Sequence, residues 1–385
     1  MSRPDPEAVR GIMNPPAAVA PSQHVSTDGP TDGPTDGPTD GPTTRRTPEL
    51  QPHALPADPL HRFVSLYEAL DRDRGFWGDA SSLRFAAMTA VLCAGDPEVI
   101  ANDLRATAVE IKEQSGWFGA LRSPLRFIVS ALLLLSGDSP RELLREVERV
   151  SAVFREHRLR RGGIYETMAI LILRQQHDLE RIPEAAVERF RALYEEMKRH
   201  HWWLTGPDDF PACAILVGKE GTPEEIGQRI EEIYQALGRR GFSPGDPLQT
   251  AANILFLARH APETLAERYQ QLAEGFRAAG VSIWRSDYDE LAILSFLDHP
   301  TSQVVDRVLD RRLAMERLRP EPDRSLTFNL AAGISFLELV QLDGDLETIT
   351  GTKALLDMQA IINAQQAAAA AAASSAAVVA SSSGS

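Results

Sequence analysis

Six prolines divide the middle of the chain into segments of nearly constant length. They are Pro97, Pro140, Pro183, Pro223, Pro262 and Pro300, and the successive gaps are 43, 43, 40, 39 and 38 residues. An amphipathic, charged segment follows each proline at once, as in SPRELLREVERV. Proline is favoured at the first position of a helix because its missing N–H is not needed there. Each proline therefore predicts the start of a helix.

A second kind of segment, more apolar and rich in alanine, lies ahead of each proline. The six examples read FAAMTAVLCA, FIVSALLLL, ETMAILIL, FPACAILVG, LQTAANILFLA and ELAILSFL, and NLAAGISFLELV follows as a seventh. The scarcity of charge predicts helices that are buried on most sides, and the small residues allow neighbouring helices to approach closely. Each unit is therefore predicted to be a hairpin of a buried helix, a turn and a half-exposed helix.

Hairpins of this kind bury their apolar faces only when they stack. The sequence therefore predicts an all-α fold of tandem helical hairpins of about 40 residues each, with six full units and a terminal half between residues 78 and 342. An open α-solenoid and a closed α/α toroid both agree with this number of units.

The two ends of the chain differ from the repeats. Residues 1–57 include four copies of Thr-Asp-Gly-Pro, and proline at every fourth residue opposes both helix and sheet, so we expect a disordered tail there. Residues 346–385 form a C-terminal segment of Ala/Ser-rich low complexity. The α-helical repeat domain is expected at residues 58–345.

The charge balance argues against several kinds of partner. Acidic residues outnumber basic residues by 54 to 40, and the resulting net charge of −14 repels phosphate backbones and anionic lipids. No apolar run approaches the length of a transmembrane helix, and no apolar leader is recognised. Cys93 and Cys213 lie far apart in apolar stretches, which predicts free thiols. We expect a cytoplasmic protein that binds neither nucleic acid nor membranes.

The tryptophans share one kind of position, the joint between a charged helix and the next apolar helix. They are Trp77, Trp117, Trp202, Trp203 and Trp284. Acidic residues begin the apolar helices, and Arg122 and Arg126 stand among them. Because every such joint of a regular stack falls on the same edge, the sequence predicts a rim of aromatic rings and carboxylates. Helix dipoles and hydrophobic staples are the alternative explanation of the same residues.

The stretch RHHWWLTGPDDFP, residues 199–211, is the richest of these joints. Its adjacent histidines and adjacent aspartates point about 100° apart on a helix, so we expect no metal site, and no motif indicates a cofactor. Acid–base chemistry remains open, with Asp208, Asp209 and His201 as catalytic candidates. As a joint, the stretch would use Thr205 or Asp208 to cap a helix that begins near Phe210.

This stretch resembles a bacterial family known as domain of unknown function number four thousand and three (DUF4003). The residues that carry the resemblance are Tyr194, Met197, Lys198, His201, Trp203, Leu204, Thr205, Gly206, Asp208, Asp209 and Phe210. A second stretch, WFGALRSPLR, is similar at Phe118, Arg122, Ser123 and Arg126. The resemblance covers most of residues 60–340 and implies no particular chemistry. Phe210 stands where the family pattern has tyrosine, which excludes a phenol role there.

Two functions agree with these features. The first is a binding or scaffolding module whose rim takes a protein, a peptide or a small polar ligand. The expected binding residues are Arg122, Arg126, Trp117, Trp202, Trp203, Thr205 and Trp284. The second is an enzyme of toroid type with Asp208 or Asp209 as acid or base, His201 as its partner and an arginine for an anionic substrate group. An enzyme requires these side chains to face one pocket.

Overall fold

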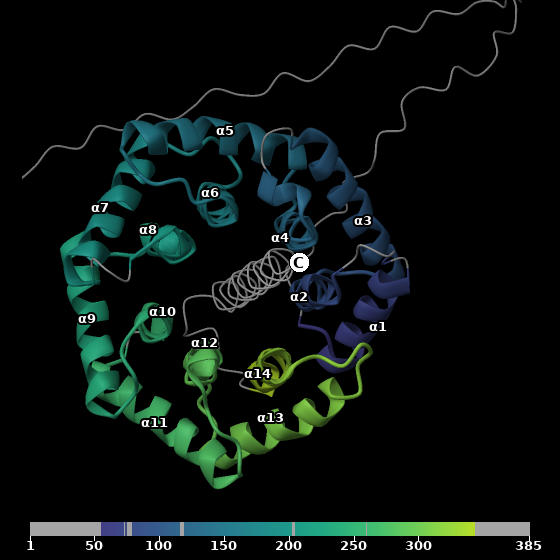
Figure 1. Ribbon diagram of the computed structural model, residues 1–385, viewed down its shortest axis with the longest axis vertical. Helices are drawn as coiled ribbons and strands as arrows, with labels where there is room; N and C mark the ends of the chain where they lie inside the picture. Colours follow the sequence, from purple (N-terminus) through teal and green to yellow (C-terminus); the bar gives the residue numbers. More distant parts are fainter. Residues whose placement is uncertain are drawn as a thin grey trace, which may run out of the picture. The chain divides into compact units, whose positions relative to one another are not determined.

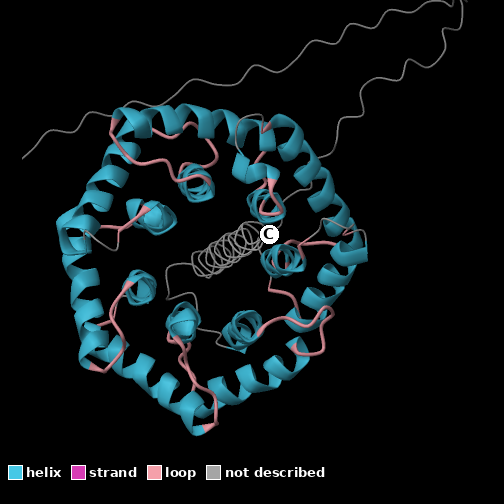
Figure 2. Cartoon of the chain, viewed as in Figure 1, coloured by secondary structure: helices cyan, strands magenta, loops and turns pink. Residues whose placement is uncertain are grey.

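A computed structural model describes residues 55–72, 74, 79–115, 119–201, 205–258 and 260–342, all within the unit that begins at Glu49. Every regular element in these ranges is a helix, which confirms the all-α class (Figure 2). The predicted tail at residues 1–57 lies outside the described residues except for its last three, and residues 346–385 lie wholly outside them. None of the described helices has the length and apolarity needed to cross a membrane.

The charged helices form an outer layer. They are α1 (Pro59–Arg72), α3 (Pro97–Gln114), α5 (Pro140–Glu156), α7 (Glu184–His201), α9 (Pro223–Arg239), α11 (Pro262–Ala278) and α13 (Thr301–Met315). Each of the six repeated prolines stands at the first residue of a helix or immediately before it, as predicted. Side chains complete several of these starts. The Asp96 carboxylate accepts the Glu98 N–H at 2.9 Å, and the Thr222 hydroxyl accepts the Glu225 N–H at 3.2 Å.

The apolar segments form an inner layer. They are α2 (Ala80–Ala90), α4 (Arg126–Ser136), α6 (Ile164–Gln176), α8 (Phe210–Val217), α10 (Asp246–Leu255), α12 (Tyr288–Leu294) and α14 (Arg324–Leu342). Figure 1 shows these helices enclosed by the outer ones. Within the inner layer α2 packs closely on α4, α6 on α8 and α10 on α12, whereas α8 and α10 approach each other less closely.

The first and last helices of the described unit are neighbours. Helix α14 packs against α1 and α2. The Tyr67 hydroxyl of α1 donates to the Arg319 carbonyl oxygen at 3.0 Å, and the buried Arg84 guanidinium of α2 donates to the Pro320 carbonyl oxygen. The proline pattern did not identify α1, because no apolar segment precedes Pro59.

Replacing Ala214 or Ala252 with phenylalanine should destabilise the protein by about 1–3 kcal/mol. Both alanines are completely buried, in α8 and α10, so a larger ring must displace a neighbouring helix. Urea unfolding would measure the loss. Ala185 is exposed on α7, and Ala185→Phe should change stability by about 0.5 kcal/mol or less. Equal effects at buried and exposed positions would show that the inner helices are not tightly packed.

Candidate functional site

The joints that lead into α6, α8 and α10 lie close to one another. Asp208, at the start of α8, interacts electrostatically with Tyr165 at the start of α6 and with Asp246 at the start of α10. Gln249, in the first turns of α10, places its side-chain N–H₂ 3.4 Å from the Thr205 hydroxyl. The structure therefore gathers the N-terminal ends of these three inner helices at one edge.

The stretch from Thr205 to Phe210 forms a tight joint between α7 and α8. The Thr205 N–H and hydroxyl both donate to the His201 carbonyl oxygen, at 3.0 and 3.1 Å, and so finish α7. The Gly206 N–H then donates to the Asp209 carboxylate at 2.9 Å across the short turn η2 (Pro207–Asp209). Helix α8 begins at Phe210, as predicted. The predicted cap was wrong: neither Thr205 nor Asp208 caps α8, and Asp209 instead holds the turn.

Phe210 anchors the joint in the core. Its completely buried ring makes edge-on contacts with Phe154, Phe190 and Tyr194 at centroid distances of 5.9, 5.4 and 5.2 Å. A Cβ atom at Gly162 would stand only 2.9 Å from the ring, so this glycine leaves the space that the ring occupies. Because Phe210 is held firmly in the core, the position of Asp209, the residue directly before it, is fixed as well.

Asp209 is a buried carboxyl group with no cationic partner among the described residues. Only 9% of the residue is exposed, and its second oxygen lies 3.5 Å from the Gln249 side-chain nitrogen. Burial above all, together with the nearby carboxylates of Asp208 and Asp246, raises the pKa of Asp209 from 3.8 to about 8, against the hydrogen bond from Gly206. Asp209 is therefore largely protonated at neutral pH.

Two other joints use a buried acid in the same way but neutralise it. Asp287 accepts the Trp284 N–H at 2.8 Å, and the Arg324 guanidinium lies 3.0 Å from the same carboxylate. Glu166 accepts the Gly162 N–H at 2.8 Å and forms an ion pair with Arg155. Asp209 differs from both because no described arginine meets it.

Two buried amides lie on α10, and one of them, Gln249, contacts Asp209. Gln249 is 2% exposed and Asn253 is 5% exposed, and the two stand four residues apart on one face of α10. The Gln249 side-chain oxygen and both polar atoms of the Asn253 side chain have no hydrogen-bond partner among the described residues. We call Thr205, Asp209, Gln249 and Asn253 the polar cluster. It joins the start of α8 to α10, where the two helices pack less closely.

His201 does not join the polar cluster. Its imidazole nitrogen lies 2.7 Å from the Glu231 carboxylate, and its ring lies 4.4 Å from the ring of Tyr234. Both partners belong to the outer helix α9. The His201 imidazole is therefore paired with an acid of the outer layer. Asp208 is exposed.

The predicted binding residues lie in different places. Trp117, Trp202 and Trp203 lie outside the described residues. Trp284 is 57% exposed, with the Arg324 guanidinium 4.3 Å above its ring. Arg126 is half-buried and donates to the carbonyl oxygens of Arg122 and Ser123, at 3.1 and 2.9 Å. Arg122 is exposed. Of the predicted binding residues that the structure describes, Thr205 alone belongs to the polar cluster.

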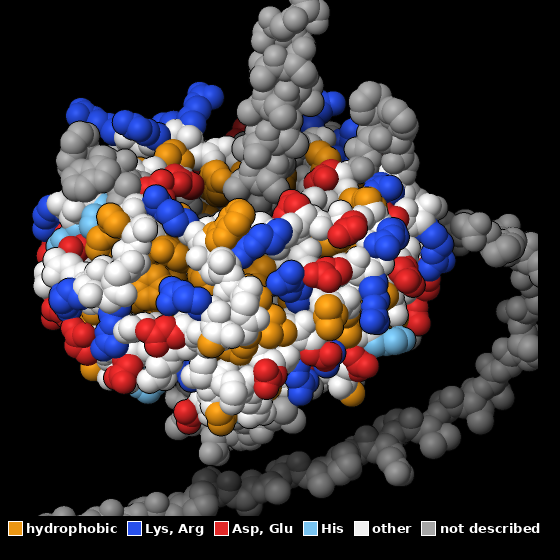
Figure 3. Space-filling model, turned by 60° about the horizontal axis from the view of Figure 1, so that its bottom comes forward, with side chains coloured by type: hydrophobic (Ala, Val, Ile, Leu, Met, Phe, Trp, Pro, Cys, Tyr) orange, Lys and Arg blue, Asp and Glu red, His pale blue; other side chains and the backbone are white. Residues whose placement is uncertain are grey.

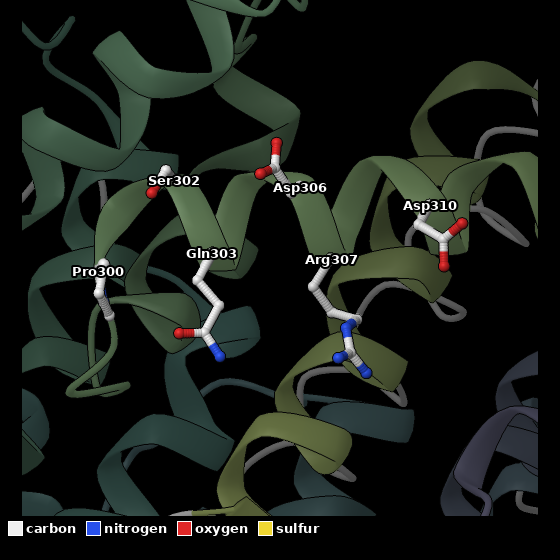
Figure 4. A pocket seen from close by; sticks show the side chains of 6 residues that line it. All are labelled: Pro300, Ser302, Gln303, Asp306, Arg307 and Asp310. Carbon is white, nitrogen blue, oxygen red and sulfur yellow. The ribbon is translucent and has the colours of Figure 1, made fainter.

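The surface away from the joints offers a less convincing site. A hollow of about 490 Å³ lies along α13, and its described lining residues all come from Pro300–Asp310 (Figure 4). Among the residues that the structure describes, no second element contributes a side chain to this hollow. On the face shown in Figure 3, acidic and basic side chains are interspersed, so neither sign forms a continuous patch there.

Sequence reasoning missed Gln249 and Asn253. Their only signal is a pair of amides spaced by four in the otherwise apolar segment LQTAANILFLA, which places both on one side of a helix. Buried amides in such a segment indicate either a hydrogen-bonded partner helix or a ligand.

Comparisons with known proteins identify a family. A family model described as "Protein of unknown function (DUF4003)" matches residues 66–367. The uncharacterized protein YeaA of Bacillus subtilis (strain 168) is 27% identical over 177 residues, which is 46% of this chain and 52% of that protein. No solved structure matches the chain. Because the family model spans most of the chain and includes the stretch around Asp209, the protein belongs to the DUF4003 family.

Proposed function

We propose that this protein binds a small polar ligand at the polar cluster of Thr205, Asp209, Gln249 and Asn253, within a closed α/α toroid. The contacts of α14 with α1 and α2 support the closed arrangement over an open solenoid. The side chains of the polar cluster are buried, so they are accessible to a small ligand rather than to the surface of a large partner. This favours a binding module over a scaffold. A cytoplasmic location is part of the proposal.

The observation that carries the proposal is the Asn253 side chain, whose two polar atoms are buried without partners among the described residues. A buried polar group left unpaired costs about 1–3 kcal/mol, and such groups are rare in folded proteins. Asn253 has a buried neighbour of the same kind in Gln249, and Asp209 is a buried acid without a cation. A polar ligand would supply the missing hydrogen bonds of all three side chains.

An acid–base enzyme is the alternative, and the raised pKa of Asp209 is the observation that favours it. A carboxyl group with a pKa of about 8 holds a proton that it can donate near neutral pH. The pairing of His201 with Glu231 removes the partner that this alternative assigned to Asp209. We therefore rank ligand binding first and treat turnover of the bound ligand as a further outcome.

The test compares the full-length protein with Asn253→Leu, which keeps the branched shape and the number of side-chain heavy atoms and removes both unpaired polar atoms. Without ligand, Asn253→Leu should be more stable by about 1–3 kcal/mol, because two unsatisfied groups are gone. In a thermal-shift screen of sugars, amines, nucleotides and peptides, a compound that raises the melting temperature of the wild type should not raise that of Asn253→Leu.

Thr89→Val is the matched control. Thr89 is buried in the inner helix α2, and its hydroxyl donates to the Phe85 carbonyl oxygen at 3.0 Å. Removing this satisfied group should be neutral or destabilising and should leave every ligand response unchanged. If Asn253→Leu destabilises as well, and its ligand responses equal those of the wild type, Asn253 is a structural amide and the proposal is wrong.

A further inference from the structure

The polar cluster offers mainly hydrogen-bond acceptors to a ligand. The Gln249 and Asn253 side-chain oxygens have no hydrogen-bond partner among the described residues. The Thr205 hydroxyl oxygen lies 3.4 Å from the Gln249 side-chain nitrogen. The Asp209 oxygen that does not bind Gly206 has only a weak contact with the same nitrogen, at 3.5 Å. Asn253 adds one unpartnered donor, its N–H₂ group. A ligand group that donates several hydrogen bonds and accepts none matches these oxygens.

The electrostatic surroundings are negative. The charged groups that act on the Asp209 carboxyl group are Asp208 on η2 and Asp246 on α10, and both are acids. The neighbouring titratable groups on α7 and α8 are Tyr194 and Cys213, and burial keeps both neutral by raising their pKa values. An anionic group at this position would add a like charge to a partly desolvated region, whereas a cation would be attracted.

We propose that the ligand of the polar cluster carries a primary ammonium group, which donates hydrogen bonds to the Asp209 carboxylate and to the Gln249 and Asn253 side-chain oxygens. This inference rests on the proposed function and names its ligand class, a small amine. The Asn253 N–H₂ group would donate to a hydroxyl or carbonyl oxygen beside the amine.

A metal ion fits the cluster less well than an ammonium group. Among the described residues, no three His, Cys, Asp or Glu side chains converge closely enough to hold a metal. Asp209 is the one carboxyl group of the cluster, and the other groups are neutral. One carboxylate with two amide oxygens satisfies the three N–H donors of an ammonium group.

Binding of an ammonium group should release a proton. At about pH 7 the free protein holds the Asp209 carboxyl group mainly in its protonated form, since its pKa is about 8. The ammonium ion favours the carboxylate, so the carboxyl O–H transfers its proton to the buffer while the ligand keeps its own charge. The number of protons released on binding therefore reports directly on the ionisation of Asp209.

The experiment is calorimetric titration of the full-length protein at about pH 7 in two buffers of different ionisation enthalpy. The probes are putrescine and 1,4-butanediol, which share a four-carbon chain and differ in their charged ends. Putrescine should bind and release up to one proton, and butanediol should not bind. Asp209→Asn should weaken putrescine binding by about 10-fold or more and abolish the proton release.

Asp103→Asn is the control for the loss of a carboxyl group elsewhere, because Asp103 is exposed on α3 and undergoes the same chemical change. It should leave the affinity for putrescine unchanged. Equal putrescine affinity in wild type and Asp209→Asn would overturn the inference, as would a failure of putrescine to bind. If butanediol binds instead, and Asn253→Leu abolishes that binding, the ligand is uncharged: the amine inference is then wrong while the proposed binding function stands.

Discussion

Asp209→Asn should be more stable than the wild type at about pH 8 and nearly equal to it at about pH 4. Burial raises the pKa of Asp209 from 3.8 in its ordinary setting to about 8 in the folded protein. Between these values the folded protein keeps a proton that the unfolded chain has lost. Stability of the wild type therefore falls as the pH rises, by up to about 1.4 kcal/mol per pH unit, whereas asparagine has no proton to lose.

The matched variant is Asp287→Asn, which should have the opposite effect at neutral pH. Asp287 holds the same kind of turn, but its carboxylate is paired with Arg324 at 3.0 and 3.2 Å. Its loss leaves the guanidinium without that partner, which should cost about 1–3 kcal/mol. Urea unfolding midpoints between about pH 4 and pH 8 would measure both variants. Parallel pH curves for wild type and Asp209→Asn would show that Asp209 is ionised in the folded protein.

Arg174→Met should destabilise the protein by about 3–5 kcal/mol. The Arg174 guanidinium of α6 makes two hydrogen bonds to the Asp138 carboxylate, at 2.7 and 2.8 Å, and so ties α6 to the turn before α5. The two side chains are only 7% and 3% exposed. Removing the arginine leaves a buried carboxylate whose remaining hydrogen bond, among the described residues, comes from the Ser139 N–H at 2.8 Å.

An exposed pair provides the comparison for this prediction. Arg145 lies 2.7 Å from Glu142 on α5, and these side chains are 56% and 50% exposed. Arg145→Met should cost about 1 kcal/mol or less, because water screens the pair. Denaturant unfolding at neutral pH would measure both variants. A cost for Arg174→Met as small as that for Arg145→Met would show that water reaches Asp138.

The helix starts were predictable because local chemistry decides them. A proline after a small or polar residue determines where a helix can begin, whatever that helix later packs against. Pro97, Pro140, Pro223 and Pro262 are each the first residue of their helix. Helix α1 escaped notice because the pattern depended on pairs of segments. Its inner-layer neighbours are α2 and α14, and α14 comes from the far end of the chain.

The candidate site was predictable only in part. Asp209 could be selected from its place in a long motif, but its contact with Gln249 joins it to a residue 40 positions further on. The partner of His201 is Glu231, on the next outer helix, and residue spacing within the motif cannot reveal that contact. Gln249 and Asn253 look like minor polar interruptions of an apolar helix until the helix facing them is known.

The contact between the two ends of the described helices bears on how the chain folds. Most hairpins can dock on the hairpin made immediately before them, so their contacts are local in sequence. The hydrogen bond from Tyr67 to Arg319 instead joins residues 252 positions apart, which gives this seam a high contact order. While the chain is being synthesised, the faces of α1 and α2 that later meet α14 stay uncovered until almost every other hairpin has been made. That seam is where we expect the growing chain to be most exposed to aggregation.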